Sequence, residues 1–249
     1  MNSAFANVKT IAKRELSAYF ASPVAYVFIV IFLLLAGFFT FMAGGCFERN
    51  QANRVSFFLW HPWLYLFLVP AVGMRLWSEE RRMGTMELLL TMPITTWQAI
   101  VGKFLASWLF LGLALVCTFP VVMTVNYLGN PDNGVIVAAY VGSLLLAGAY
   151  LAISCMTSAL TRNQVVSFIL SVVISLFLIL AGWPPVTRLL EQISEDPRLV
   201  EMVAAFSVMT HFEGFQRGVI DTRDLVFFLT VIVFCLFSTS VIIRGHRAG

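Results

Sequence analysis

The sequence RLWSEERRMGTMELLLTMP, residues 75–93, is a charged stretch in a chain of 249 residues that is otherwise rich in apolar side chains. It lies between two apolar runs that are each long enough to cross a lipid bilayer as a helix. We therefore expect this segment, which we call the insert, to lie at a membrane surface. There it is available to a partner outside the membrane.

The composition indicates an integral membrane protein. Hydrophobic residues make up 59% of the chain and charged residues 12%, whereas soluble domains carry about 45–50% apolar and about 25% charged residues. Six apolar runs approach or exceed the ~20 residues that a membrane-spanning helix needs. They cover residues 23–43, 57–76, 99–125, 135–157, 165–183 and 225–243. The sequence thus predicts an all-α integral membrane protein with six transmembrane helices.

The basic residues predict the orientation of these spans. With the amino terminus in the cytoplasm, ten of the 16 Lys and Arg residues fall inside, together with four acidic residues. Six basic and nine acidic residues then fall outside. Because cytoplasmic loops carry an excess of Lys and Arg, we expect both termini to be cytoplasmic. The small net charge of +3 does not indicate nucleic-acid binding.

Local motifs predict where several helices begin. Residues 1–22 have the apolar spacing of an amphipathic helix with basic residues, which favours a position in the membrane interface. Ser22 and Pro23 supply a helix cap and a preferred first residue for span one. Thr95 and Gln98 form a capping-box pattern before span three. Residues 184–224, between spans five and six, are expected to form short outer helices.

Side chains within the spans indicate few chemical roles. No Asp, Glu, Lys, Arg or His lies away from the span ends, which argues against a proton-driven transporter. Lys103 is expected to extend to the cytoplasmic surface, and Trp77 to belong to an interfacial aromatic belt. The four cysteines have neither metal-site nor disulfide spacing. His211 with Met209 suggests copper by ligand type alone, and our prediction is no metal site.

The insert carries its own helical pattern. Met83, Met86, Leu89 and Leu90 lie close to one helical face, and the charged residues lie mostly elsewhere. Gly84 and Thr85 should break the helix, and Pro93 should end its second part. One interpretation is a surface helix that binds a partner. The alternative is a charged loop that only fixes the topology.

The insert resembles a family pattern. Residues 77–93, WSEERRMGTMELLLTMP, followed by GKF at 102–104, resemble the E-E-[RK]-x-x-G-T-x-E-x-L-L-x-x-P…G-K-F pattern of ABC-2 type permeases. The chain is similar to the gliding-motility-associated permease and to the copper-site maturation permease of nitrous oxide reductase systems. Further agreement comes from KREL at 13–16, SP at 22–23, FLVP at 67–70, LTRNQ at 160–164 and HFEGFQRGVIDTRD at 211–224.

This resemblance covers nearly the whole chain and implies one permease domain over residues 1–249. It implies a multi-pass protein of the bacterial cytoplasmic (inner) membrane with a coupling helix at 77–93. The permease would pair with a second copy as a homodimer, or with a related permease. The coupling helix would sit in a groove of a separate ATPase subunit. The implied coupling positions are Glu79, Glu80, Arg81, Met83, Gly84, Thr85, Glu87, Leu88 and Leu89.

The chain lacks the phosphate-binding loop G-x-x-x-x-G-K-[ST]. Gly102 and Lys103 are followed by Phe104, and Trp97 stands where the upstream glycine would be. ATP and Mg²⁺ are therefore expected on the partner subunit, and this chain is expected to have no catalytic residues and no cofactor of its own. A polytopic membrane enzyme would need a cluster of His, Asp or Glu, which the sequence does not show.

Two functions follow from the resemblance. The first is a transmembrane permease that couples ATP hydrolysis by a separate subunit to export or translocation of an unidentified substrate. The alternative is a mechanotransmission subunit that drives a periplasmic or membrane-anchored accessory protein without moving cargo. In that case residues 184–224 would be the partner site, whereas otherwise their charged residues form a solvated face. Membrane lipid is expected around the spans in both cases.

Overall fold

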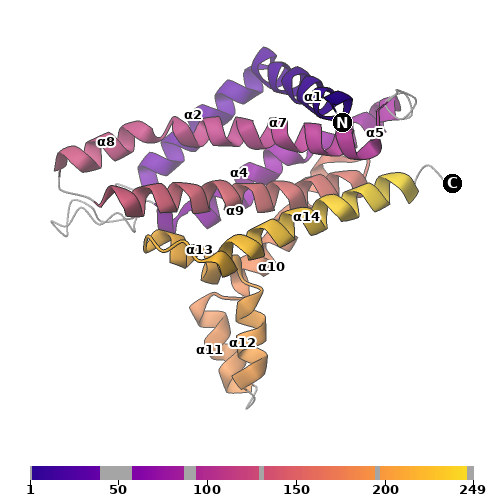
Figure 1. Cartoon of the computed structure of the whole chain (residues 1–249). Coiled ribbons are helices and arrows are strands. Elements are labelled where there is room, and N and C mark those ends of the chain that lie inside the picture. The colour runs from indigo at the N-terminus through magenta and orange to yellow at the C-terminus, as the bar shows by residue number, and fades with distance from the viewer. Residues whose placement is uncertain (1, 40–57, 87–93, 129–131, 194–196, 246–249) are drawn as a thin grey trace.

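The computed structural model describes residues 2–39, 58–86, 94–128, 132–193 and 197–245 (Figure 1). All regular secondary structure within these ranges is helical, which confirms the all-α class. Helix α9 (Asn133–Leu160) forms the centre of the bundle and is buried along most of its length. Around it pack α4 (His61–Gly73), α7 (Thr96–Val116), α10 (Gln164–Leu180), α13 (Val208–Gln216) and α14 (Thr222–Gly245).

Helices α7, α9 and α14 are each long and apolar enough to cross a membrane. Within the described ranges there are up to five such spans if each of two bent helix pairs counts as one. The run predicted at 57–76 contains α4, which has 13 residues and includes Pro70. After Met74 the chain continues as α5 (Arg75–Met83). A multi-pass membrane protein is thus supported, and the count of six spans stays a prediction.

The amino-terminal region forms an elbow of two helices. Helix α1 (Asn2–Ala21) packs along α7, and α2 (Pro23–Phe38) leaves it at a bend of 78°. The Ser22 hydroxyl accepts a hydrogen bond from the backbone N–H of Val24, which confirms the predicted cap. Gly102 permits the close approach of α1, because a Cβ there would lie 2.8 Å from the Cγ2 atom of Ile11.

The segment between α10 and α14 contains three short helices. Helices α11 (Pro184–Ile193) and α12 (Pro197–Ala205) form a hairpin that projects away from the bundle, whereas α13 packs against α9 (Figure 1). The apolar side chains of Leu189 and Met202 on this hairpin, and of Phe206 directly after it, are exposed. The predicted short helices are therefore present. Their position relative to the membrane stays a prediction.

Helices α4 and α9 approach each other closely at Gly73. A Cβ atom at this position would lie 2.3 Å from the Cβ atom of Ser154. We expect Gly73→Ala to lower the free energy of unfolding by about 1–3 kcal/mol, because the two helices must separate. Equilibrium unfolding in mixed detergent–SDS micelles measures this change. The control is Gly37→Ala in α2, where a Cβ meets nothing within 4 Å. Equal losses from both variants would contradict the close approach.

Candidate functional site

The beginning of the insert is attached to the central helix through Ser158 of α9. The Ser158 hydroxyl accepts hydrogen bonds from the backbone N–H groups of Trp77 and Ser78, both at 3.0 Å. It also donates to the carbonyl oxygen of Met74 at 2.8 Å. The first N–H groups of a helix need partners from outside that helix. Ser158 supplies this cap from another element, so the start of α5 is held against α9.

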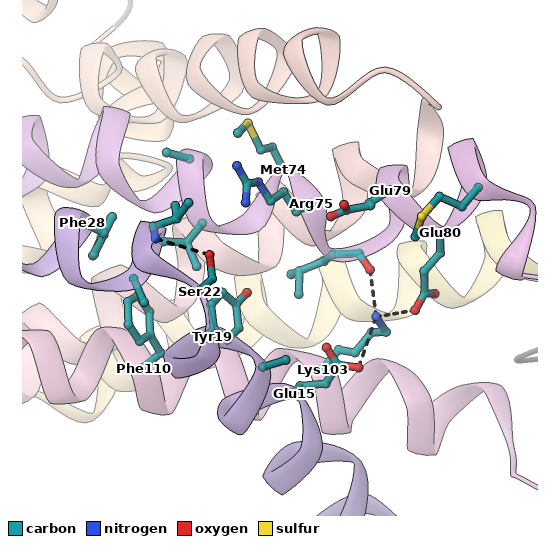
Figure 2. Close-up of a pocket in the computed structure, with 17 residues that line it drawn as sticks. Glu15, Tyr19, Ser22, Phe28, Met74, Arg75, Glu79, Glu80, Lys103 and Phe110 are labelled. Carbon is teal, nitrogen blue, oxygen red and sulfur yellow. Dashed lines mark hydrogen bonds and ion pairs between the residues drawn. The ribbon is translucent and has the colours of Figure 1, made fainter.

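Lys103 of α7 connects three helices through one buried ammonium group. Its Nζ lies 2.7 Å from Oε1 of Glu80 in α5 and 3.7 Å from Oε1 of Glu15 in α1. It also donates to the carbonyl oxygen of Leu76 at 3.2 Å (Figure 2). Only 5% of the Lys103 side chain is exposed. We call Glu15, Glu80 and Lys103 the charged cluster. Since a buried charge needs an opposite charge and hydrogen bonds, the three helices are held together here.

Trp77 lies beside the charged cluster and is itself buried. The ammonium group of Lys103 lies 5.3 Å from the centre of its ring, a distance at which a cation is attracted to an aromatic face. The indole N–H donates to Sγ of Cys155 at 3.2 Å. Trp77 therefore fills the space between α5, α7 and α9. The expectation that it belongs to an interfacial aromatic belt is wrong, because it is only 1% exposed.

Arg81 attaches the second turn of α5 to the carboxyl end of α9. Its guanidinium donates to the carbonyl oxygen of Ala159, one of the last carbonyls of that helix, which have no partner within it. Burial lowers the pKa of Arg81 below its ordinary value, and the positive charge of nearby Arg162 lowers it further. The charges of these two guanidinium groups thus repel each other at this end of the bundle. An acidic partner surface would reduce their repulsion.

The described part of the insert has an exposed stretch of four residues, Arg82, Met83, Gly84 and Thr85, which we call the insert tip. Helix α5 ends at Met83 because Gly84 adopts a left-handed conformation with φ of 70°, which glycine reaches without steric cost. Thr85 and Met86 begin another helical turn. This confirms the predicted break at Gly84. The insert tip offers both an apolar and a basic side chain to a partner.

The predicted coupling residues occupy different environments. The tip residues Met83, Gly84 and Thr85 are exposed, and Glu79 and Arg81 are partly buried. Glu80 contacts Lys103 within the chain. Glu87, Leu88 and Leu89 lie outside the described residues. Their common role in coupling stays a prediction.

Lys103 was expected to extend to the membrane surface, and this expectation is wrong. Glu15 and Glu80 bind its ammonium group inside the protein. Glu15 was not among the predicted site residues. The signal available in the sequence was that Glu15 and Lys103 both fall within stretches matching the permease pattern, although nothing there indicated that they form a pair.

The other end of the bundle holds a polar contact at His211 of α13. Its Nδ1 lies 2.7 Å from Oδ1 of Asp224, and its Nε2 lies 3.0 Å from the carbonyl oxygen of Ala205. Both ring nitrogens are therefore engaged within the protein, which leaves neither for a copper ion. No group of three or more potential metal ligands occurs among the described residues.

An all-helical protein with several membrane-spanning helices and an exposed charged insert has the features of a transporter's membrane subunit. The sequence profile of the ABC-2 family transporter proteins matches residues 64–210, more than half of the chain. The chain therefore belongs to the ABC-2 transporter family. This family membership implies a separate ABC ATPase as partner. No curated protein matches the sequence.

Proposed function

We propose that this chain is the permease subunit of an ABC transporter and that its insert receives movement from a separate ATPase. The observation that carries the proposal is the buried contact of Lys103 with Glu80 of the insert helix and Glu15 of α1. A force applied at the insert tip would pass through these contacts to α1 and α7. Ser158 and Arg81 would pass it to α9.

The proposed arrangement is a six-span permease in the bacterial cytoplasmic membrane with the insert and both termini in the cytoplasm. Two observations support it. The amino end of α1 and the carboxyl ends of α5 and α14 lie at the same end of the bundle (Figure 1), and the charges of Arg81 and Arg162 interact there. Basic residues favour the cytoplasmic side. We further propose pairing with a second permease copy. The sequence resemblance favours the gliding-motility and nitrous-oxide-reductase maturation group.

A second candidate function is mechanotransmission to an extracytoplasmic protein. The α11–α12 hairpin favours it, because this hairpin projects from the bundle (Figure 1) and exposes the apolar side chains of Leu189 and Met202. In this alternative the ATPase moves the permease, and the hairpin moves a partner. In that case the permease would not carry any substrate across the membrane.

A crosslinking experiment tests the proposed docking surface. A photoreactive amino acid at Met83, which is 59% exposed, is expected to crosslink the chain to an ABC ATPase in intact cells. The physical reason is that the insert tip would lie in contact with that subunit. Mass spectrometry of the crosslinked product identifies the partner.

The matched control carries the same photoreactive residue at Met202 of α12, which is 61% exposed. No ATPase crosslink is expected there. An ATPase crosslink at Met202 but not at Met83 would contradict the proposed orientation and docking site. A crosslink from Met202 to an extracytoplasmic protein would favour mechanotransmission.

A further inference from the structure

A pocket lies beneath the elbow that α1 and α2 form. Its volume is about 390 Å³, which falls within the range of about 300–1,000 Å³ that is usual for small-molecule sites. The bend of 78° at Ser22 separates the two helices, and α4, α5 and α7 complete the wall. Ala18 and Val24 line the pocket and are exposed, so it opens to the outside beside the elbow.

The pocket has an apolar end and a charged end. Figure 2 shows the aromatic rings of Phe28 and Phe110 at one end and Glu79, Glu80 and Lys103 at the other. Tyr19 and Ser22 lie between the two ends. This division matches an amphiphile whose head group and hydrocarbon part need different surroundings. A water-soluble metabolite that filled the pocket would place polar groups against the aromatic end, where they would find no polar contact.

The charges at the polar end are only partly balanced within the protein. Oε1 of Glu80 binds Lys103. The second oxygen, Oε2, is shielded from solvent and has no hydrogen-bond partner among the described residues. Among the residues that the structure describes, neither Glu79 nor Arg75 forms an ion pair with any residue. The pocket therefore offers carboxylate oxygens to a hydrogen-bond donor and a guanidinium group to an anion.

We propose that this pocket binds a phospholipid with a primary ammonium head group, of the phosphatidylethanolamine type. The ammonium group would donate hydrogen bonds to Glu80 and Glu79, and the phosphate would contact Arg75. Hydrocarbon would lie along Phe28 and Phe110. A choline head group has no N–H to donate to Oε2 of Glu80. A glycerol head group brings a negative charge, without a cation, to a pocket with three acidic and two basic residues.

Native mass spectrometry of the full-length chain tests this proposal. The purified protein is exchanged into mixed micelles containing equal amounts of phosphatidylethanolamine, phosphatidylcholine and phosphatidylglycerol. We expect phosphatidylethanolamine to be retained about tenfold more than either other lipid, because charge-assisted hydrogen bonds are lost with both. Equal retention of the three lipids would overturn the proposal.

Two variants and one control test whether the bound lipid lies in the pocket. Ala18→Trp, which extends a ring into the pocket from an exposed position, is expected to abolish selective retention. Ala21→Trp is the control, because Ala21 is exposed on the same helix and does not line the pocket. Arg75→Gln should lower retention of phosphatidylethanolamine about tenfold. Unchanged retention in Ala18→Trp, with an unfolding midpoint like that of Ala21→Trp, would overturn the assignment.

A soluble competitor separates a lipid site from a site for a small zwitterion. Phosphoethanolamine carries the same ammonium and phosphate groups without hydrocarbon. Because the aromatic end would contribute to lipid binding, we expect an equimolar amount of phosphoethanolamine to leave the bound lipid in place. Complete displacement would show that the head group alone is recognised and would overturn the lipid assignment. None of these measurements requires the ATPase, so their failure would leave the proposed coupling function untouched.

Discussion

Replacing Lys103 with methionine is expected to lower the free energy of unfolding by about 3–5 kcal/mol, because it leaves the largely buried carboxylate of Glu80 without its counter-charge, whereas Glu15 keeps its ion pair with Arg14. Oε1 of Glu80 lies 2.7 Å from the ammonium group, and that of Glu15 lies 3.7 Å from it. Methionine retains most of the side-chain volume, so the effect is one of charge. Equilibrium unfolding in mixed detergent–SDS micelles measures the loss.

The matched control is the surface ion pair between Arg217 and Glu213. Nη2 of Arg217 lies 2.8 Å from Oε1 of Glu213, but the Arg217 side chain is 70% exposed and the Glu213 side chain 59%. Arg217→Met should therefore change the unfolding free energy by about 0.5 kcal/mol or less. If Lys103→Met and Arg217→Met have equal effects, the charged cluster does not hold the three helices together.

The double variant Lys103→Met/Glu80→Gln separates stability from coupling. Removing both charges of the closest pair should recover about half of the lost stability. The connection between insert and bundle would still lack its ion pair. We therefore expect the purified complex of the double variant to hydrolyse ATP without driving the permease, as in Lys103→Met alone. Recovery of both stability and coupling would show that the cluster only stabilises the fold.

Features that depend on neighbouring residues were predictable from the sequence. The cap at Ser22, the capping box of Thr95 with Gln98 and the helix end at Gly84 all involve atoms within a few residues. The chemistry of these motifs is local, and the structure confirms each of them. The all-helical class follows from the long apolar runs in the same way.

The environment of the charged cluster was not predictable by the same reasoning. Lys103 lies near a span end, where a lysine ordinarily extends to the surface. Its burial depends on Glu15 and Glu80, which are distant in sequence and reach it only after α1 and α5 pack against α7. Trp77 was misassigned for the same reason, since its partner Cys155 comes from α9. Single-sequence patterns describe helix ends better than contacts between helices.

The largest effect on coupling is expected from Gly84→Leu. Gly84 has φ of 70°, and its backbone N–H donates to the carbonyl oxygen of Glu80, which ends α5. A branched L-residue in this conformation costs about 1–2 kcal/mol. A Cβ at this position meets nothing within 4 Å, so the strain comes from the backbone alone. We expect the insert to change direction after Met83 while the bundle stays folded.

The measurement is the amount of ATPase that co-purifies with the tagged permease, together with ATP hydrolysis by the complex. Gly84→Leu should reduce co-purification about tenfold, the change that corresponds to about 1.4 kcal/mol. Gly84→Asn is the matched control, because asparagine enters the left-handed region more readily than other non-glycine residues. It should retain most of the binding. Because both side chains point into open space, equal losses would mean that side-chain bulk at the insert tip, not backbone conformation, disturbs the partner. Normal coupling in Gly84→Leu would contradict the assignment of the insert as the coupling element.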